Sequence, residues 1–223
     1  TDPNVFASVY NGLLGGLAST GAKGIVANIP SVTSIPYFTT VPYNAIPLDA
    51  AKAGAVNQGY APYNGGIQQA LAALTGTGLF TAEEAAKRTI TFTAGQNAVV
   101  IIDEDLTDLG AINPAFAALP KYRQATAEDL LVLTSRTFLG TVVNNNPQLI
   151  NGVSVPLADK WVLTPEEQEA VEVARTAYNQ TIEALATQYD VAFFDAAQSL
   201  LDLVGAGITQ NGITTTAVYA TGG

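Results

Sequence analysis

Apolar residues recur at helical spacing near the N-terminus and again in the last third of the chain. Asp2 followed by Pro3 is a typical helix start, and one apolar face then carries Val5, Phe6, Val9, Tyr10, Leu13, Leu14 and Leu17. Thr164-Pro165-Glu166-Glu167 combines an N-cap, a proline at the first helical position and a capping-box glutamate. The face that follows it carries Val171, Ala174, Tyr178, Ile182, Leu185 and Tyr189. Both patterns predict long amphipathic helices.

A short apolar run follows each of these helices. Residues 24–30 predict one strand and residues 191–194 predict another, after which Asp195 caps a further helix. A helix followed by a continuous apolar strand is typical of a parallel sheet that is covered on both faces. The sequence therefore predicts two helix–strand units, 2–30 and 164–195, that form half of a doubly wound sheet.

The middle of the chain is less regular. Residues 31–64 are marked by proline and tyrosine and predict a long loop. Helices are expected over residues 67–74 and from Thr81, where Thr81-Ala82-Glu83-Glu84 fits a capping box. Residues 89–93 and 98–102 predict two strands that are joined as a hairpin.

The remaining segments are short. A helix is expected over residues 130–134, a loop over 144–160, and a last extended piece over 214–218. The whole pattern predicts a single α/β domain over residues 1–223. Residues 31–160 form an insertion or subdomain within it.

Composition narrows the class of protein. Hydrophobic residues make up 48% of the 223 residues and charged residues 13%, which predicts a compact globule. The net charge of −10 disfavours nucleic acid and anionic membrane surfaces as partners. No run of about 18 apolar residues is present, so we expect no transmembrane segment.

The chain contains no histidine, cysteine or methionine. Histidine is the usual general base near neutral pH, so a serine nucleophile within these residues lacks its commonest activator. Cysteine would supply a thiolate nucleophile or metal ligand, and it is absent as well. We expect no catalytic residue, no cofactor and no metal site in the chain.

Two groups of side chains have alternative interpretations. The acidic residues of 103–108 (Asp103, Glu104, Asp105 and Asp108) would suit calcium, but no glycine-spaced EF-hand loop accompanies them, which favours a solvated turn. Five aromatic residues would form an apolar ligand wall or pack the long loop onto the sheet: Tyr37, Phe38, Tyr43, Tyr60 and Tyr63.

Four stretches together resemble the SGNH (GDSL-type) hydrolase family, in particular its exported lipoprotein subgroup from Bacteroidetes-type bacteria. They are residues 21–38 (GAKGIVANIPSVTSIPYF), 123–130 (RQATAEDL), 162–167 (VLTPEE) and 191–196 (VAFFDA). The resemblance implies a three-layer α/β/α sandwich with a mainly parallel, flavodoxin-like sheet. It also implies a serine esterase or lipase-like activity and an exported, periplasmic or outer-membrane-anchored lipoprotein.

The family's catalytic blocks are missing from this chain. Neither Gly-Asp-Ser, Gly-x-Asn-Asp nor Asp-x-x-His occurs in the sequence. We therefore expect the chain to be an internal, incomplete scaffold portion of such a hydrolase, inactive alone. A small-molecule, lipid or glycan ester would be bound through the parent protein. Missing segments or an oligomer would complete the sheet.

The loop after the first predicted strand is the candidate substrate-binding segment. Loops at the carboxyl ends of strands line the site in doubly wound folds, and this loop carries Pro30, Ser31, Thr33, Ser34, Tyr37 and Phe38. The plainer interpretation is a surface loop ordered by prolines. The alternative function is a non-catalytic cell-surface module that binds a glycan, a lipid or a protein.

Overall fold

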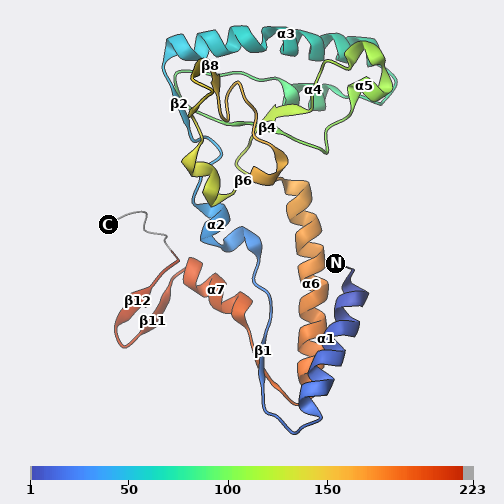
Figure 1. The fold of residues 1–223 in the computed structure, drawn as a ribbon, viewed down its shortest axis with the longest axis vertical. Coiled ribbons are helices and arrows are strands. Elements are labelled where there is room, and N and C mark those ends of the chain that lie inside the picture. Colours follow the sequence, from blue (N-terminus) through green and yellow to red (C-terminus); the bar gives the residue numbers. More distant parts are fainter. Residues whose placement is uncertain (1, 218–223) are drawn as a thin grey trace. The chain divides into compact units, whose positions relative to one another are not determined.

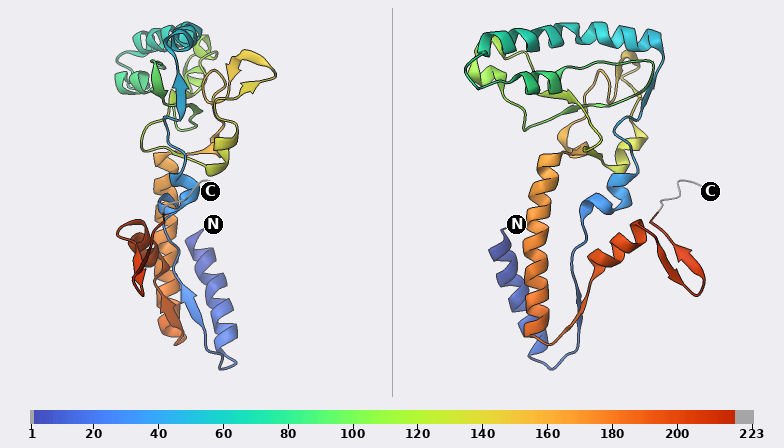
Figure 2. Two further views of the ribbon diagram at one scale, coloured as in Figure 1. Left: turned by 90° about the vertical axis from the view of Figure 1, so that its left-hand side faces the viewer. Right: turned by 180° about the vertical axis from the view of Figure 1, so that it is seen from behind.

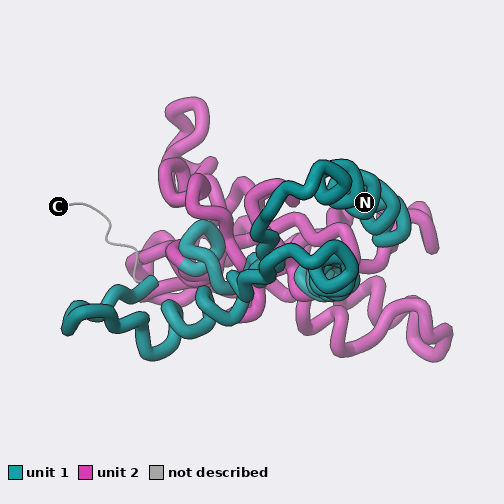
Figure 3. The backbone as a smooth tube through the Cα atoms, turned by 90° about the horizontal axis from the view of Figure 1, so that it is seen from below, with its two compact units in different colours: residues 1–39, 166–223 teal, residues 40–165 magenta. Residues whose placement is uncertain are grey.

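The structure, a computed structural model that describes residues 2–217, is a mixture of helices and small sheets (Figure 1). It divides into two compact units, coloured separately in Figure 3. Unit 1 comprises residues 1–39 and 166–223, and unit 2 comprises residues 40–165. Unit 2 therefore lies, in sequence, between the two halves of unit 1. That residues 31–160 are an insertion in a single SGNH-like domain stays a prediction.

Unit 1 contains two helix–strand pairs and a C-terminal hairpin. Its elements are α1 (Pro3–Ala18), β1 (Ile25–Ala27), the 3-10 turn η1 (Val32–Ser34), α2 (Pro36–Thr39), α6 (Pro165–Gln188), β10 (Ala192–Phe194), α7 (Ala196–Val204), β11 (Ile208–Gln210) and β12 (Ile213–Thr215). The predicted N-caps are confirmed for two helices. Asp2 accepts a hydrogen bond from the Asn4 N–H, and Asp195 accepts one from the Gln198 N–H.

Strands β1 and β10 of unit 1 pair in parallel, as the sequence predicted for its two helix–strand units. Ile25 lies opposite Ala192 in the ladder formed by β1 and β10. Helices α1 and α6 lie side by side in both ribbon views (Figures 1 and 2). The Phe6 and Tyr178 rings are 4.4 Å apart between centroids, which joins the two helices.

Apolar side chains of unit 1 remain exposed around this parallel pair. Ile25 on β1 is 76% exposed and Phe194 on β10 is 52% exposed. On α1, the outer positions are also open: Val5, Val9, Leu13 and Leu17. Parallel sheets are normally covered on both faces. The predicted three-layer sandwich stays a prediction, because β1 and β10 are the parallel strands within the described residues.

Unit 2 is built on one long helix and four antiparallel strand pairs. The pairs are β2–β3, β4–β5, β6–β9 and β7–β8. Its helices are α3 (Ala50–Leu74), α4 (Ala82–Arg88), α5 (Leu109–Ile112) and the 3-10 turns η2 (Pro114–Phe116), η3 (Leu133–Thr137) and η4 (Asp159–Trp161). Its strands are β2 (Ile46–Leu48), β3 (Gly95–Asn97), β4 (Val100–Ile102), β5 (Tyr122–Gln124), β6 (Leu130–Leu131), β7 (Val142–Val143), β8 (Asn146–Ile150) and β9 (Val162–Leu163).

Strand β4 lies at the centre of the unit 2 core. It pairs with β5 on one side, and on the other the Val100 N–H donates to Gly152 O while the Leu157 N–H donates to Val100 O. Val100 and Ile101 are fully buried. Helix α3 covers one side of this core (Figure 2), and it contributes buried residues Ala53, Tyr60, Ile67, Ala70 and Leu74.

Asparagine side chains on α3 hold an extended segment of unit 2. The amide of Asn57 donates to Phe92 O at 2.9 Å and accepts from the Phe92 N–H at 2.8 Å. Asn64, two turns later, bonds both backbone groups of Ile90 in the same way, at 2.8 and 3.0 Å. Each amide thereby replaces the neighbouring strand that would otherwise satisfy these buried groups.

This geometry corrects the hairpin predicted from residues 89–93 and 98–102. Residues 89–93 are extended, with Ile90 and Phe92 buried as the alternation requires, but their hydrogen bonds go to side chains and they form no strand ladder. The segment 95–97, predicted to be the turn, is strand β3 and pairs with β2. The alternation of apolar residues in 89–93 determines which of their side chains are buried. The hydrogen-bond partners of their backbone, however, come from residues that are distant in the sequence.

The loop predicted over residues 31–64 is also wrong in its second half. Asp49 caps α3 by accepting from the Lys52 N–H, and the helix continues through Pro62 to Leu74. A proline inside a helix removes one hydrogen bond and normally ends or kinks it. Here the buried face of α3 outweighs that cost.

Two further short segments differ from expectation. Residues 130–131 form strand β6, not the start of a helix, and the 3-10 turn η3 follows. Within the predicted loop 144–160, residues 146–150 form strand β8 against β7. Asn144 and Asn145 both have positive φ, at 50° and 57°, which is the two-residue turn chemistry that joins such strands.

The remaining predictions concern the chain end and the membrane. Of the extended piece predicted over 214–218, residues 214 and 215 belong to β12 (Ile213–Thr215), which pairs with β11, while Val218 lies outside the described residues. Across residues 2–217, no helix combines the length and apolarity that crossing a bilayer requires.

We predict that Asn64→Leu destabilises the protein by about 2 kcal/mol or more, because it leaves the buried N–H and C=O of Ile90 without partners. Urea-induced unfolding followed by circular dichroism measures the change. Gln69→Leu is the matched control, because Gln69 is an exposed residue of the same helix. Its effect should stay within about 0.5 kcal/mol. Equal effects of the two variants would contradict the assigned role of Asn64.

Candidate functional site at the carboxyl edge of the parallel strands

The carboxyl ends of β1 and β10 are joined by Asn28. Its Nδ2 donates to Asp195 Oδ1 at 2.8 Å, and its Oδ1 accepts from the Ala197 N–H at 2.8 Å. The Asn28 N–H donates to Phe194 O. One side chain therefore fixes the end of the first strand against both the end of the second strand and the start of α7.

The next residue, Ile29, is held by α6. Asn179 accepts from the Ile29 N–H at 2.7 Å and donates to Ile29 O at 2.9 Å. Arg175 Nη1 donates to the same carbonyl at 3.1 Å and also pairs with Glu172. The hydrogen bond from Arg175 lowers the pKa of Glu172 below its ordinary value. Two neighbouring turns of α6 thus fix where the loop leaves β1.

A shallow hollow of about 270 Å³ lies beside this loop, within unit 1. Its lining is apolar apart from Arg175: Ile29, Pro30, Val32, Val171, Ala174 and Tyr178. The volume lies just below the range of about 300–1,000 Å³ typical of small-molecule sites. It would accommodate a short apolar group, and the Arg175 charge is balanced by Glu172.

The structure brings one of the six predicted site residues into this hollow. Pro30 lines it, while Ser31, Thr33 and Ser34 form a local turn. The Ser31 and Thr33 hydroxyls are 2.9 Å apart, and Ser34 Oγ donates to Ser31 O at 2.8 Å.

Tyr37 and Phe38 lie further along the segment and pack edge to face, with ring centroids 5.0 Å apart. The predicted aromatic group is therefore divided between the units. Tyr43, Tyr60 and Tyr63 pack in the unit 2 core, and burial raises the pKa of Tyr60.

This arrangement can bind and orient but shows no nucleophile paired with a base. The Ser34 hydroxyl proton goes to a backbone carbonyl, and the sequence offers no histidine. The carboxylate of Asp195 caps α7 and accepts a hydrogen bond from Asn28, so it is engaged in structural contacts. Among residues 2–217, no group of histidine, cysteine, aspartate or glutamate side chains is arranged to hold a metal ion.

The acidic cluster of residues 103–108 is not simply the solvated turn that the sequence favoured. Asp103 is fully buried and pairs with Arg123, whose other guanidinium nitrogens donate to Asp129 at 2.6 and 2.7 Å. Burial disfavours the charged form of Arg123, but the hydrogen bonds to Asp129 and Asp103 outweigh burial and raise the pKa of Arg123. Asp108 caps α5. Asp103 and Asp108 thus stabilise loops of unit 2, while Glu104 and Asp105 are exposed, as expected for a solvated turn.

Sequence reasoning missed the three polar side chains that shape the edge: Asn28, Arg175 and Asn179. One signal was available for Asn28, since it is a single polar residue within the apolar run 24–30. Nothing local marks Asn179, because its partner Ile29 is 150 positions away in the chain.

Comparison with known proteins gave no match. No family model matches the chain, and neither a curated protein nor a solved structure matches it. Interpretation of the edge therefore rests on its own geometry and on the sequence motifs.

The pKa of Asp195 lies below its ordinary value of 3.8, first because of the hydrogen bond from the Gln198 N–H and second because of that from Asn28. We predict that Asn28→Ala raises this pKa but leaves it below 3.8, since the Gln198 bond remains. A carboxyl-detected NMR titration measures it. The stabilisation from a lowered pKa is present above the unfolded pKa and is lost as pH falls through the folded one.

Asp49 is the internal control for this titration. Its pKa is lowered mainly by the Lys52 N–H in unit 2, so it should not change in the Asn28→Ala protein. An unaltered Asp195 titration would show that Asn28 does not hold this carboxylate.

Proposed function

We propose that the chain is the scaffold portion of an SGNH/GDSL-type serine ester hydrolase of the exported lipoprotein kind. In this proposal the nucleophile, the oxyanion donors and the Asp/His block lie on polypeptide outside residues 1–223. The observation that carries the proposal is the parallel pair of β1 and β10, in which each strand follows a helix and the two helices lie side by side. This is the repeating unit of a doubly wound α/β sheet.

The uncovered surfaces of unit 1 support the same interpretation. Val9 on α1 is 67% exposed, and Ile25 on β1 is 76% exposed. Burying an apolar side chain of this size contributes about 1.5–3 kcal/mol, so a parallel strand pair with open faces is poorly stabilised alone. Further strands beside this pair would bury these residues and extend the sheet to the predicted three-layer sandwich.

The chemistry of the chain supports a binding role for the edge. The loop at Pro30 follows a parallel strand, where doubly wound folds place their ligands. The hollow beside it is apolar and small, which suits the acyl or alkyl part of an ester. A serine hydrolase needs a base to activate its serine. With no histidine in these residues, the usual base has to come from elsewhere.

The test uses the full protein encoded by the source gene and a fluorophosphonate probe, which labels activated serines. We predict that peptide mapping finds the labelled serine outside residues 1–223, and that the protein hydrolyses a p-nitrophenyl ester. Residues 1–223 alone should hydrolyse the ester at the buffer rate, a loss on the order of a million-fold.

Two substitutions in the full protein serve as controls. Ser31→Ala and Ser34→Ala should keep full turnover, because both hydroxyls are engaged in the local turn. A labelled serine within residues 1–223, or turnover by residues 1–223 that disappears in Ser34→Ala, would contradict the proposal.

A further inference from the structure

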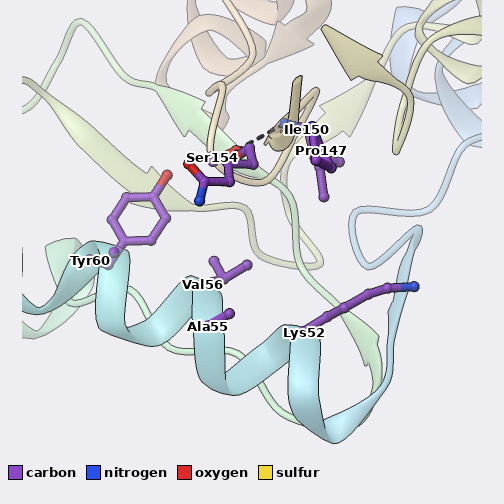
Figure 4. Close-up of a pocket in the computed structure, with 9 residues that line it drawn as sticks. Lys52, Ala55, Val56, Tyr60, Pro147, Ile150 and Ser154 are labelled. Carbon is purple, nitrogen blue, oxygen red and sulfur yellow. Dashed lines mark hydrogen bonds between the residues drawn. The ribbon is translucent and has the colours of Figure 1, made fainter. Parts of the chain in front are cut away.

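Unit 2 contains a second hollow, well apart in sequence from the edge described above. It has a volume of about 430 Å³, within the range of small-molecule sites. Helix α3 forms one wall and the segment that includes β8 forms the other (Figure 4). Side chains of Val56 and Tyr60 point from α3 toward the wall that carries Ser154, Ile150 and Pro147, and Lys52 extends at the other end of the helix segment (Figure 4).

The walls of this hollow are fixed by hydrogen bonds. Tyr60 Oη donates to Val153 O at 2.6 Å, which ties the ring to the opposite wall. Ser154 Oγ accepts from the Ile150 N–H at 2.9 Å and donates to Gln148 O at 2.5 Å. The shape is therefore formed without a ligand, and binding would require little ordering of the protein.

A glycine keeps the α3 wall open. Gly59 lies on α3 between Val56 and Tyr60, and a Cβ added there would meet no atom within 4 Å. Glycine inside a helix is unfavourable relative to alanine. Its place at the lining of the hollow leaves space that any larger side chain would occupy.

One charged group of the lining, the ammonium of Lys52, has unused donors. Lys52 is the charged residue of the lining, and its ammonium makes one exposed ion pair with Asp49 at 3.4 Å. An ammonium has three donors, so others remain. A cation beside an apolar hollow stands out in a chain of net charge −10.

We propose that this hollow binds an amphipathic monocarboxylate with a medium-length alkyl chain. The alkyl chain packs against Val56, Tyr60 and Ile150, while the carboxylate accepts from the ammonium of Lys52. The proposal concerns unit 2 alone and does not depend on the proposed hydrolase function.

The test is a titration of the 223-residue protein with decanoate, followed by amide NMR and calorimetry below the micelle concentration. We expect saturable binding with shifts at Val56, Gly59 and Ile150, and weaker binding of decanol and acetate. Gly59→Leu fills the hollow and should weaken decanoate at least tenfold. Gly65→Leu is its matched control, since Gly65 lies on the same helix, also faces open space and is not in the lining.

The contribution of the Lys52 charge to binding is tested separately. Lys52→Gln should weaken decanoate about fivefold, the size expected for one exposed ion pair, and leave decanol unchanged. Lys23→Gln removes the same charge in unit 1 and should have no effect. Three results would overturn the proposal: no saturable binding of decanoate, equal binding by Gly59→Leu and Gly65→Leu, or equal affinity for decanoate and decanol.

Discussion

Extended backbone must find hydrogen-bond partners, and the two-stranded sheets of this chain supply too few of them. Asparagine side chains on helices supply the missing hydrogen-bond partners. Asn57 and Asn64 on α3 bond both backbone groups of Phe92 and Ile90, and Asn179 on α6 does the same for Ile29. An amide carries a donor and an acceptor side by side, so it can replace one residue of a neighbouring strand. The course of residues 90–92 in unit 2 and of Ile29 in unit 1 depends on these amides.

The two units differ in how completely they bury their apolar strands. Unit 2 buries its central strand, β4, and pairs the buried carboxylates of Asp103 and Asp129 with the buried guanidinium of Arg123. Unit 1 pairs two apolar strands but leaves Ile25 and Phe194 open to solvent. Unit 2 therefore has a closed core with a preformed hollow on its surface. Unit 1 leaves apolar side chains of its parallel strand pair exposed, which supports the scaffold role that we propose for it.

The candidate edge in unit 1 is shaped by polar contacts and offers no reactive pair. Asn28 and Asn179 set the course of the loop at Pro30, while the hydroxyls of Ser31 and Ser34 are used within the loop itself. A site organised in this way would suit an apolar group held in a fixed position. Chemistry at such an edge requires a nucleophile and a base brought to it, and the 223 residues contain no histidine to serve as that base.

The local sequence pattern was sufficient to predict an element wherever a helix had a strong cap or a strand had a continuous apolar run. The helices that begin at Pro3, Ala82 and Pro165 and the strands at 25–27 and 192–194 followed from the sequence for that reason. Residues 89–93 show the limit, since their alternation gave the buried side chains but not the asparagines that hold them. Helix α3 passes through Pro62 because five buried residues outweigh one lost hydrogen bond. Burial and backbone pairing depend on residues far apart in the chain, so only the tertiary structure decided them.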